Sequence, residues 1–530
     1  MNRVFPSAAS AILILATLLS ATGAHAADAE TLLNERCASC HQPLPDGGLS
    51  RVSEIRKTPE GWDMTIVRMM LLHGVQLASD ERQTLVKYLS DQLGLAPAET
   101  APWRYILERQ PNWVETPPDD DLAVMCARCH SYARFALQRR DRGEWLKHSH
   151  FHVGQFPTIE YQALGRDRNW WDLASNEVPG KLARLYPFNT PSWNDWQAAD
   201  KPSPAGAWRI VGEQPGRGRY TGSAAITSSG EDSYQIELNL SYADGQSVTG
   251  QGDGIVYTGY EWRARVQQGG ESVLQVLALS EDGQSLSGRW FLNDNDALGS
   301  TVRLVRMGDA PVILSVEPPY IKAGETANLL IHGINLAQGD INLGEGVSVE
   351  QILHQGAAAV AIRASAAATA AAGTRTVQLG DAQGDGLLTV YDQIDAVRVE
   401  PDYAIARVGN AEGPVAPVPA QFDAVAYMNG PDDLAGTDDD IRIGSMPASW
   451  SVDNANETAA AMQDAKYAGQ LSATGLFQPA SAGPNPARRY QTNNAGELSI
   501  NATIGTGDEA VSGSARLVVT VQRWNDPPIR

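Results

Sequence analysis

Polar and apolar positions after residue 204 alternate with a period of two in many short segments. YQIELNLSY, YEWRARV, VLQVLAL and LSGRWFL each place every second side chain on one face, and Gly, Asp and Asn residues separate them. This period is typical of antiparallel strands with one buried face. The pattern predicts a β-barrel or a β-sandwich over residues 201–310.

Two further all-β domains are predicted, over residues 311–394 and 395–530. APVILSVEPPY opens the first, and VRVEPDY repeats its Val-Glu-Pro theme at the start of the second. Both are expected to be immunoglobulin-like, and the first resembles the IPT type. The alanine-rich run at 356–373 favours a helix on propensity alone, but we expect strand and loop because strand-like segments follow directly.

The first 200 residues have helical patterns instead. The segment ASDERQTLVKYLSDQLG carries a 3.6-residue apolar repeat, and Ser79 is its predicted N-cap. A stretch rich in proline and tryptophan, 101–118, is expected to connect two helical units of about 27–100 and 101–200. The predicted fold class is multidomain: one α-helical domain over 27–200, followed by three all-β domains.

The N-terminus resembles a secretory signal peptide over residues 1–26. Arg3 precedes a short apolar run, and an Ala-His-Ala sequence ends at Ala26. The run is too short to span a bilayer of about 30 Å, so we expect cleavage near Ala26, export to the periplasm and no membrane anchor. The net charge of −21 excludes nucleic acid and anionic membranes as expected partners.

The four cysteines of the chain fall in two Cys-x-x-Cys-His motifs: Cys37, Cys40 and His41, then Cys126, Cys129 and His130. In c-type cytochromes the two thiols form thioethers with haem, and the histidine is the proximal iron ligand. Zinc could also use these residue types, and disulfides could use four cysteines. The adjacent histidine in both copies favours two covalently bound haems c, in a helical domain of the cytochrome c kind.

The two segments that follow the motifs each contain a tryptophan, and they can be aligned on it. Met69 lies seven residues beyond Trp62, and His152 lies seven residues beyond Trp145. This repeat predicts one His/Met haem and one bis-His haem, with Met69 and His152 as the sixth ligands. No methionine lies between residues 125 and 307, which favours histidine for the second haem. The alternatives are Met70 or His73 for the first haem and His148 or His150 for the second.

An aromatic block follows the second motif and contains Trp170, Trp171, Trp193 and Trp196. We expect these rings to cover an exposed haem edge, because aromatic side chains bury large areas. The β region has neither a Gly-x-Ser-x-Gly nor a His-Glu-x-x-His motif. It is therefore expected to be a scaffold or docking surface, and no catalytic residue is predicted.

These features together resemble the α subunit of quinohaemoprotein amine dehydrogenase. The segments RNWWDLASNEVPGKLARLYP and WRIVGEQPGRGRYTG and the order of the domains carry the resemblance, which covers essentially the whole mature chain. It implies a heterotrimer with a β-propeller subunit and a small subunit that carries a cysteine tryptophylquinone. The quinone is not expected in this chain, because haem uses all four cysteines.

The resemblance also implies a reaction. Primary amines would be oxidised to aldehydes and ammonia at the quinone, and electrons would pass through the two haems to a periplasmic copper protein or a small cytochrome c. Two other functions remain open from the sequence. One is a self-sufficient dihaem enzyme of the peroxidase type, with an open iron position; the other is a stand-alone dihaem carrier whose β domains bind a partner.

Overall fold

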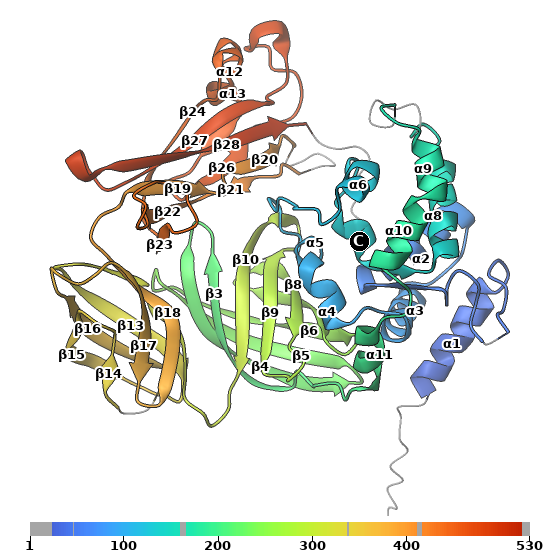
Figure 1. Ribbon diagram of the computed structural model, residues 1–530, viewed down its shortest axis with the longest axis horizontal. Coiled ribbons are helices and arrows are strands. Elements are labelled where there is room, and N and C mark those ends of the chain that lie inside the picture. The colour runs from blue at the N-terminus through green and yellow to red at the C-terminus, as the bar shows by residue number, and fades with distance from the viewer. Residues whose placement is uncertain (1–23, 46, 160–165, 337–338, 411–415, 522–530) are drawn as a thin grey trace, which may run out of the picture.

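The computed structural model describes residues 24–45, 47–159, 166–336, 339–410 and 416–521. The predicted signal peptide therefore lies almost wholly outside the described residues. Figure 1 shows four regions in sequence order: helices at the right, a barrel in the centre, and two further β domains at the left. Among the described residues, no helix is both long and apolar enough to cross a membrane.

The N-terminal region is helical, as its apolar pattern predicts. Its elements are α1 (Ala24–Cys37), β1 (Ile55–Lys57), α2 (Pro59–His73), α3 (Ser79–Gln92), α4 (Pro97–Thr100), η2 (Ala101–Trp103), α5 (Arg104–Leu107), α6 (Asp120–Leu122), η3 (Ala123–Ala127), α7 (Ala133–Ala136), β2 (Gln138–Arg140), α8 (Arg142–Gln155), α9 (Trp170–Asn176), α10 (Val178–Leu185) and α11 (Pro191–Ala198). The predicted cap at Ser79 is wrong. Ala78 holds the N-cap position of α3, and its N–H donates to Glu81 at 2.8 Å, so the glutamate supplies the cap.

The central region is a closed eight-stranded barrel, so the barrel alternative is the correct one. Its strands are β3 (Gly206–Gln214), β4 (Gly218–Gly230), β5 (Ser233–Tyr242), β6 (Ser247–Tyr257), β7 (Glu261–Gln268), β8 (Glu271–Leu279), β9 (Ser285–Leu292) and β10 (Asn295–Arg306). Neighbouring strands pair in sequence order, and β10 also pairs with β3, which closes the ring. In β5 buried and more exposed residues alternate, as a period of two requires.

Helix α11 packs against the barrel and corrects one sequence expectation. Trp193 and Trp196 belong to the barrel's own hydrophobic core and are 7% and 6% exposed. The indole N–H of Trp196 donates to the carbonyl oxygen of Thr258 at 2.8 Å. These two rings therefore bury their area in the barrel and do not cover a haem edge, whereas Trp170 and Trp171 remain half-buried on α9.

Buried polar contacts join the helical region to the barrel. The Arg104 guanidinium lies 3.1 Å from the carboxylate of Glu261, whose side chain is 1% exposed. The Tyr260 hydroxyl donates to the carbonyl oxygen of Leu95 at 3.0 Å and lies 2.8 Å from the Thr100 hydroxyl. Buried polar groups with good partners fix one orientation of the elements that carry them, so these contacts hold α4 and α5 against β7.

The third region consists of two four-stranded sheets around one core. Its strands are β11 (Val312–Glu317), β12 (Tyr320–Lys322), β13 (Thr326–Ile334), β14 (Ile341–Asn342), β15 (Val347–Gln355), β16 (Ala359–Ala366), β17 (Gly373–Leu379) and β18 (Ala382–Tyr391). The sheet orders are β11-β13-β16-β15 and β12-β18-β17-β14. The alanine-rich run forms strand β16, which confirms the expectation of strand and loop.

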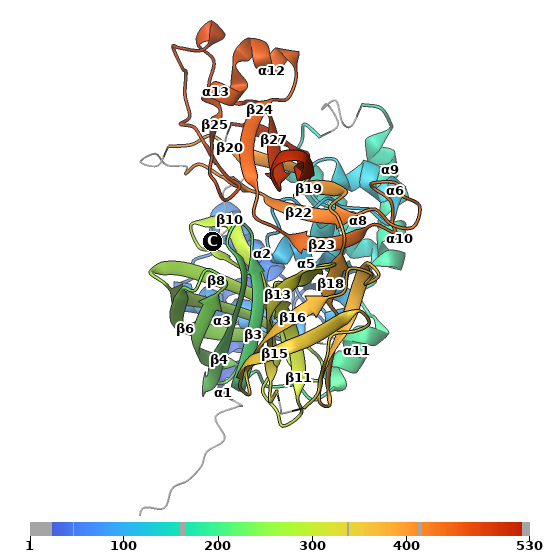
Figure 2. The same ribbon diagram turned by 90° about the vertical axis from the view of Figure 1, so that its left-hand side faces the viewer.

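The fourth region lies above the barrel in both views (Figures 1 and 2). Its elements are β19 (Ala396–Glu400), β20 (Tyr403–Arg407), β21 (Ala420–Gln421), β22 (Asp423–Met428), β23 (Ile441–Ser445), β24 (Ser449–Asn454), α12 (Glu457–Met462), α13 (Asp464–Tyr467), β25 (Gly469–Leu471), β26 (Leu476–Pro479), η5 (Arg489–Gln491), β27 (Gly496–Ile504), η6 (Gly507–Glu509) and β28 (Val511–Thr520). The strands form a four-stranded sheet, β20-β28-β27-β24, and two three-stranded sheets.

Candidate functional site

The first Cys-x-x-Cys-His motif begins at the last residue of α1. The N–H groups of Cys40 and His41 donate to the Cys37 carbonyl oxygen at 3.1 and 3.0 Å, so a tight turn holds the motif together. The Nδ1 atom of His41 lies 2.8 Å from the carbonyl oxygen of Ser50. When Nδ1 carries the proton and donates it to this carbonyl, Nε2 is free to bind a metal.

The second motif lies on and after the π-helical turn η3. The two helical units, about 27–100 and 101–200, are called the first and second lobes below. Cys126 is half-buried and packs against the core of the second lobe, whereas Cys129 is exposed. The Nδ1 atom of His130 lies 2.9 Å from the carbonyl oxygen of Ser131. In both motifs the Nδ1 atom of the histidine therefore lies beside a backbone carbonyl oxygen, which leaves Nε2 available.

Helix α8 brings His152 close to His130, with ring centres 6.4 Å apart. Its Nδ1 lies 3.1 Å from the carbonyl oxygen of His148, so Nε2 is again the available nitrogen. A metal–imidazole bond is about 2.0–2.1 Å long and the ring centre lies roughly 1.2 Å beyond the nitrogen, so two imidazoles across one metal have ring centres about 6.4 Å apart. The spacing of the two rings therefore matches that of two imidazoles bound to one metal.

The other two candidate histidines lie elsewhere on α8. The His148 ring stacks on Phe151 at 5.8 Å, and the His150 ring lies 4.9 Å from Trp171. Within the described residues, the rings in contact with His130 are those of His152 and Phe135. Of the three histidines, the structure thus brings His152 to the second motif.

Burial lowers the pKa of both His130 and His152 below the ordinary value of histidine. Desolvation disfavours the charged imidazolium, so both rings favour the neutral form that binds metals. In the part of the chain that the structure describes, no three His, Cys, Asp or Glu side chains are grouped as a site for a metal ion.

In the first lobe, α2 carries all three candidate sixth ligands. Met70 packs against the core cluster to which Cys37 also contributes. Met69 is half-buried and His73 is exposed. The position in the repeat therefore favours Met69, whereas packing against the core favours Met70.

The two lobes have the same local structure at matching positions. The side chains of Thr58 and Asp141 cap α2 and α8, and each accepts a backbone N–H three residues further on. Trp62 and Trp145 follow at the same place in their helices, and each is 1% exposed. The sequence repeat that aligned Met69 with His152 thus corresponds to a repeat in three dimensions.

A buried ion cluster lies on the seam between the lobes. Strands β1 and β2 pair antiparallel, with Arg56 opposite Arg139. The Glu99 carboxylate binds both guanidiniums: Arg56 through Nη1 and Nη2 at 2.8 and 3.0 Å, and Arg139 through Nε at 2.8 Å. Burial alone would raise the pKa of Glu99, but the two arginines outweigh burial and lower it to about 2.

Sequence reasoning missed this cluster. Arg56 and Arg139 occupy matching positions of the repeat, so extending the tryptophan alignment a few residues towards the N-terminus would have paired them. Glu99 lies outside the repeat, and its role follows from the fold alone. Further contacts cross the seam: the Arg68 guanidinium lies 4.9 Å from the centre of the Phe151 ring, which joins α2 to α8.

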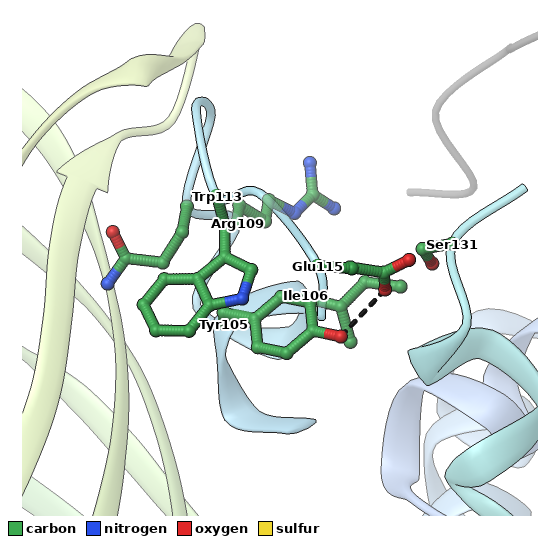
Figure 3. A pocket seen from close by; sticks show the side chains of 7 residues that line it. Tyr105, Ile106, Arg109, Trp113, Glu115 and Ser131 are labelled. Carbon is green, nitrogen blue, oxygen red and sulfur yellow. Dashed lines mark hydrogen bonds between the residues drawn. The ribbon is translucent and has the colours of Figure 1, made fainter. Parts of the chain in front are cut away.

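A pocket of about 310 Å³ adjoins the second motif at Ser131 (Figure 3). Trp113 and Tyr105 stack on one wall at 4.9 Å between ring centres. The Glu115 carboxylate accepts the Tyr105 hydroxyl at 2.6 Å and the N–H of Tyr132 at 2.7 Å. Glu115 thereby ties the connector between the lobes to the start of α7, directly after the motif.

Four family models match the chain in sequence order. Their descriptions are quinohemoprotein amine dehydrogenase A, alpha subunit, haem binding (residues 27–193), and quinohemoprotein amine dehydrogenase alpha subunit domain II (202–307), domain III (310–392) and domain IV (397–529). No curated protein matches the chain.

Solved structures are similar to parts of the chain at low scores. A redesigned β-barrel, mFAP1, bound to DFHBI has a TM-score of 0.18 at 16% identity, over 19% of this chain and 94% of that chain. A SusE-like surface polysaccharide-binding protein from Bacteroides thetaiotaomicron has a TM-score of 0.13 at 11% identity, over 56% of this chain and 54% of that chain. Scores of this size carry no functional argument.

The family matches and the geometry agree at the helical region. The haem-binding model spans both Cys-x-x-Cys-His motifs and the His130–His152 pair, and the other three models follow over the barrel and the two last β domains. The chain belongs to the family of quinohaemoprotein amine dehydrogenase alpha subunits.

Proposed function

We propose that this chain is the electron-transfer subunit of a periplasmic amine dehydrogenase. A cysteine tryptophylquinone in a small partner subunit oxidises primary amines to aldehydes and ammonia, and this chain passes the electrons to a periplasmic copper protein or a small cytochrome c. Membership of the alpha-subunit family supports the enzyme class and implies further subunits. The partners that we propose are a β-propeller subunit and the quinone-bearing subunit.

The proposed cofactors are two covalently bound haems c. Their attachment residues are Cys37, Cys40, Cys126 and Cys129, with His41 and His130 as proximal ligands. When bound there, haem would supply one-electron redox chemistry. The chain's own part is to fix each ring through two thioethers, to direct Nε2 of each motif histidine at the metal, and to bury the site.

The observation that carries the proposal is the 6.4 Å spacing of the His130 and His152 rings, each with a backbone carbonyl at Nδ1. We assign His152 as the sixth ligand of the second haem and Met69 as that of the first. Methionine ligation raises a haem potential relative to bis-imidazole ligation. The two haems would then have unequal potentials and form a directed relay.

We assign the two C-terminal β domains to the immunoglobulin-like class, the first of the IPT type, and give them a scaffold or docking role. The support is the arrangement of short, mostly antiparallel strands in layers around the cores of residues 312–391 and 396–520, with one parallel pair in each domain, β12 with β18 and β20 with β28.

The test uses the protein purified from its periplasm with its native partners. Without oxygen, a simple primary amine should reduce both haems, seen as a shift of their absorption bands, and a small quinone-bearing chain should be present in the preparation. Dithionite provides the control, because it reduces haem iron without the quinone. If dithionite reduces both haems but the amine reduces neither in the complete complex, the proposed function is wrong.

A further inference from the structure

Buried cations lie beside the second haem-binding lobe. Lys57 on β1 and Arg140 on β2 are 6% and 3% exposed and occupy matching positions of the repeat. Each lies over the tryptophan of its own lobe: Lys57 Nζ is 5.5 Å from the centre of the Trp62 ring, and the Arg140 guanidinium carbon is 5.4 Å from that of Trp145. The repeat therefore places a cation–tryptophan pair in each lobe.

The carboxylates near these cations are too few to neutralise them. Glu144, 1% exposed, is shared by Arg51 at 3.3 Å, Arg140 at 3.9 Å and Lys147. Lys57 makes no ion pair among the described residues and donates instead to the neutral Thr65 hydroxyl at 2.6 Å. A buried cation is stable in its charged form only beside a counter-charge, so this region favours the binding of an anion.

The pKa of Lys57 agrees with this excess of positive charge. Burial lowers it well below the ordinary value of lysine, and repulsion from Arg140, Arg68 and Arg51 lowers it further. A carboxylate bound beside Lys57 would raise this pKa and so favour the charged ammonium. Repulsion from Arg68, on α2, also lowers the pKa of Arg140. Cations of both lobes therefore lie near one another.

The Nε atom of Arg140 and the Nε1 atom of Trp145 are buried donors that have no hydrogen-bond partner among the described residues. Nη2 of Arg140 donates to the side-chain oxygen of Gln138 at 2.8 Å, and Nη1 faces Glu144. In the first lobe, by contrast, the Trp62 indole donates to the Leu93 carbonyl oxygen at 3.0 Å. Buried donors without partners are rare in folded proteins, and guanidinium together with N–H donors is the chemistry that binds carboxylates.

A chain of ring contacts along α8 joins Trp145 to His152, one of the two histidines of the pair. Along α8, the Trp145 ring is 6.0 Å from the His148 ring, which is 4.8 Å from the His152 ring. Haem carries two propionate carboxylates at one edge of its ring, and a haem held at the second motif would need cationic and N–H donors of this kind for them.

We propose that Arg140 and Trp145 bind a propionate carboxylate of the second haem, and that Lys57 and Arg68 of the first lobe supply the surrounding positive charge. The proposal rests on the proposed function in one respect, since it requires a haem attached at Cys126 and Cys129. It adds that the second haem is held by side chains of both lobes, and that the same cations favour its reduced form by compensating the carboxylate.

The first test is Arg140→Gln in the full-length holoprotein, with the midpoint potential of each haem measured by spectroelectrochemistry. Loss of the guanidinium leaves the carboxylate uncompensated beside the iron, which disfavours adding an electron. The potential of the second haem should therefore fall, and that of the first haem should change less. Arg142→Gln is the matched control, because Arg142 is exposed two residues further along and solvent screens its charge.

The second test is Trp145→Phe, which keeps a large ring and removes the N–H. Redox-induced infrared difference spectra should show a shifted carboxylate band. The matched Trp62→Phe variant should leave that band in place, because the Trp62 N–H is bonded to the backbone. Inorganic phosphate added to the wild-type protein should not change either potential; a phosphate-dependent potential would assign the site to a free anion and overturn the proposal.

Unchanged potentials in Arg140→Gln would overturn the proposal. Should Arg140→Gln fail to yield folded holoprotein, Trp145→Phe decides, and an unchanged carboxylate band overturns the proposal. Wild-type protein that lacks the second haem would instead refute the proposed function, so the two failures are distinguishable.

Discussion

The substitution Glu99→Gln tests the ion cluster that joins the two helical lobes. The amide has nearly the size of the carboxylate but removes the negative charge, so Arg56 and Arg139 remain buried side by side without a counter-ion. Both guanidiniums and the Thr190 hydroxyl, at 3.0 Å, lose a charged acceptor. We therefore expect the helical domain to be strongly destabilised.

The pKa of Glu99 gives the size of the expected loss in the free energy of unfolding. Glu99 falls from the ordinary value of 4.5 to about 2 in the folded protein, and at 1.36 kcal/mol per pKa unit this corresponds to roughly 3 kcal/mol. Loss of one partner of a buried ion pair costs a similar 3–5 kcal/mol or so. Because the folded pKa is depressed, this stability is present above pH 4.5 and is lost as the pH falls towards 2.

Urea unfolding of the holoprotein at pH 7, followed by the haem absorption band, measures the effect on the helical domain separately from the β domains. With a slope of about 1–3 kcal/mol per molar urea, the midpoint should fall by roughly 1–3 M. Glu177→Gln is the control: Glu177 is exposed, and its replacement should change stability by less than about 0.5 kcal/mol. An unchanged midpoint for Glu99→Gln would refute the argument that Glu99 holds the two arginines.

The remaining predictions concern the ligands and one acidic group. His152→Ala should convert the low-spin spectrum of the second haem to a high-spin one, whereas His148→Ala should keep it low-spin; the reverse result would reassign the ligand. Met69→Leu should abolish the thioether–iron charge-transfer band of the first haem, and Met70→Leu should retain it; loss of the band in Met70→Leu instead would show that packing, not the repeat, selects the ligand. Burial raises the pKa of Asp423 to about 6, so the charged carboxylate destabilises the fold as the pH rises from 4 to 6. Asp423→Asn should therefore stabilise the protein by about 1–3 kcal/mol at pH 7 in thermal unfolding. If the variant gains no stability at pH 7 relative to pH 4, this reasoning is contradicted.

Much of the candidate site could be predicted from sequence because its chemistry is local. A Cys-x-x-Cys-His motif sets its thiols and its imidazole within one turn, whatever surrounds it. The position of His152 also followed from sequence, since two copies of one unit keep equivalent residues in equivalent places. Strand positions followed from a period of two, which each strand carries within its own residues.

Other features depended on which distant segments meet. Alternation predicts strands but not the pairing of β10 with β3 that closes the barrel. Trp196 belongs to an aromatic block that we expected to cover a haem edge. The fold instead brings its indole to the carbonyl oxygen of Thr258 in the barrel. Glu99 has no sequence signal, because its role comes from the pairing of β1 with β2, which sets Arg56 and Arg139 on either side of it.

The sequence by itself therefore predicted a haem-binding domain, its internal repeat and the order of the domains. The tertiary structure alone decided which buried charges have partners. The physical reason is that spacing along a chain specifies local geometry, whereas the desolvation and pairing of a charge depend on every element packed around it.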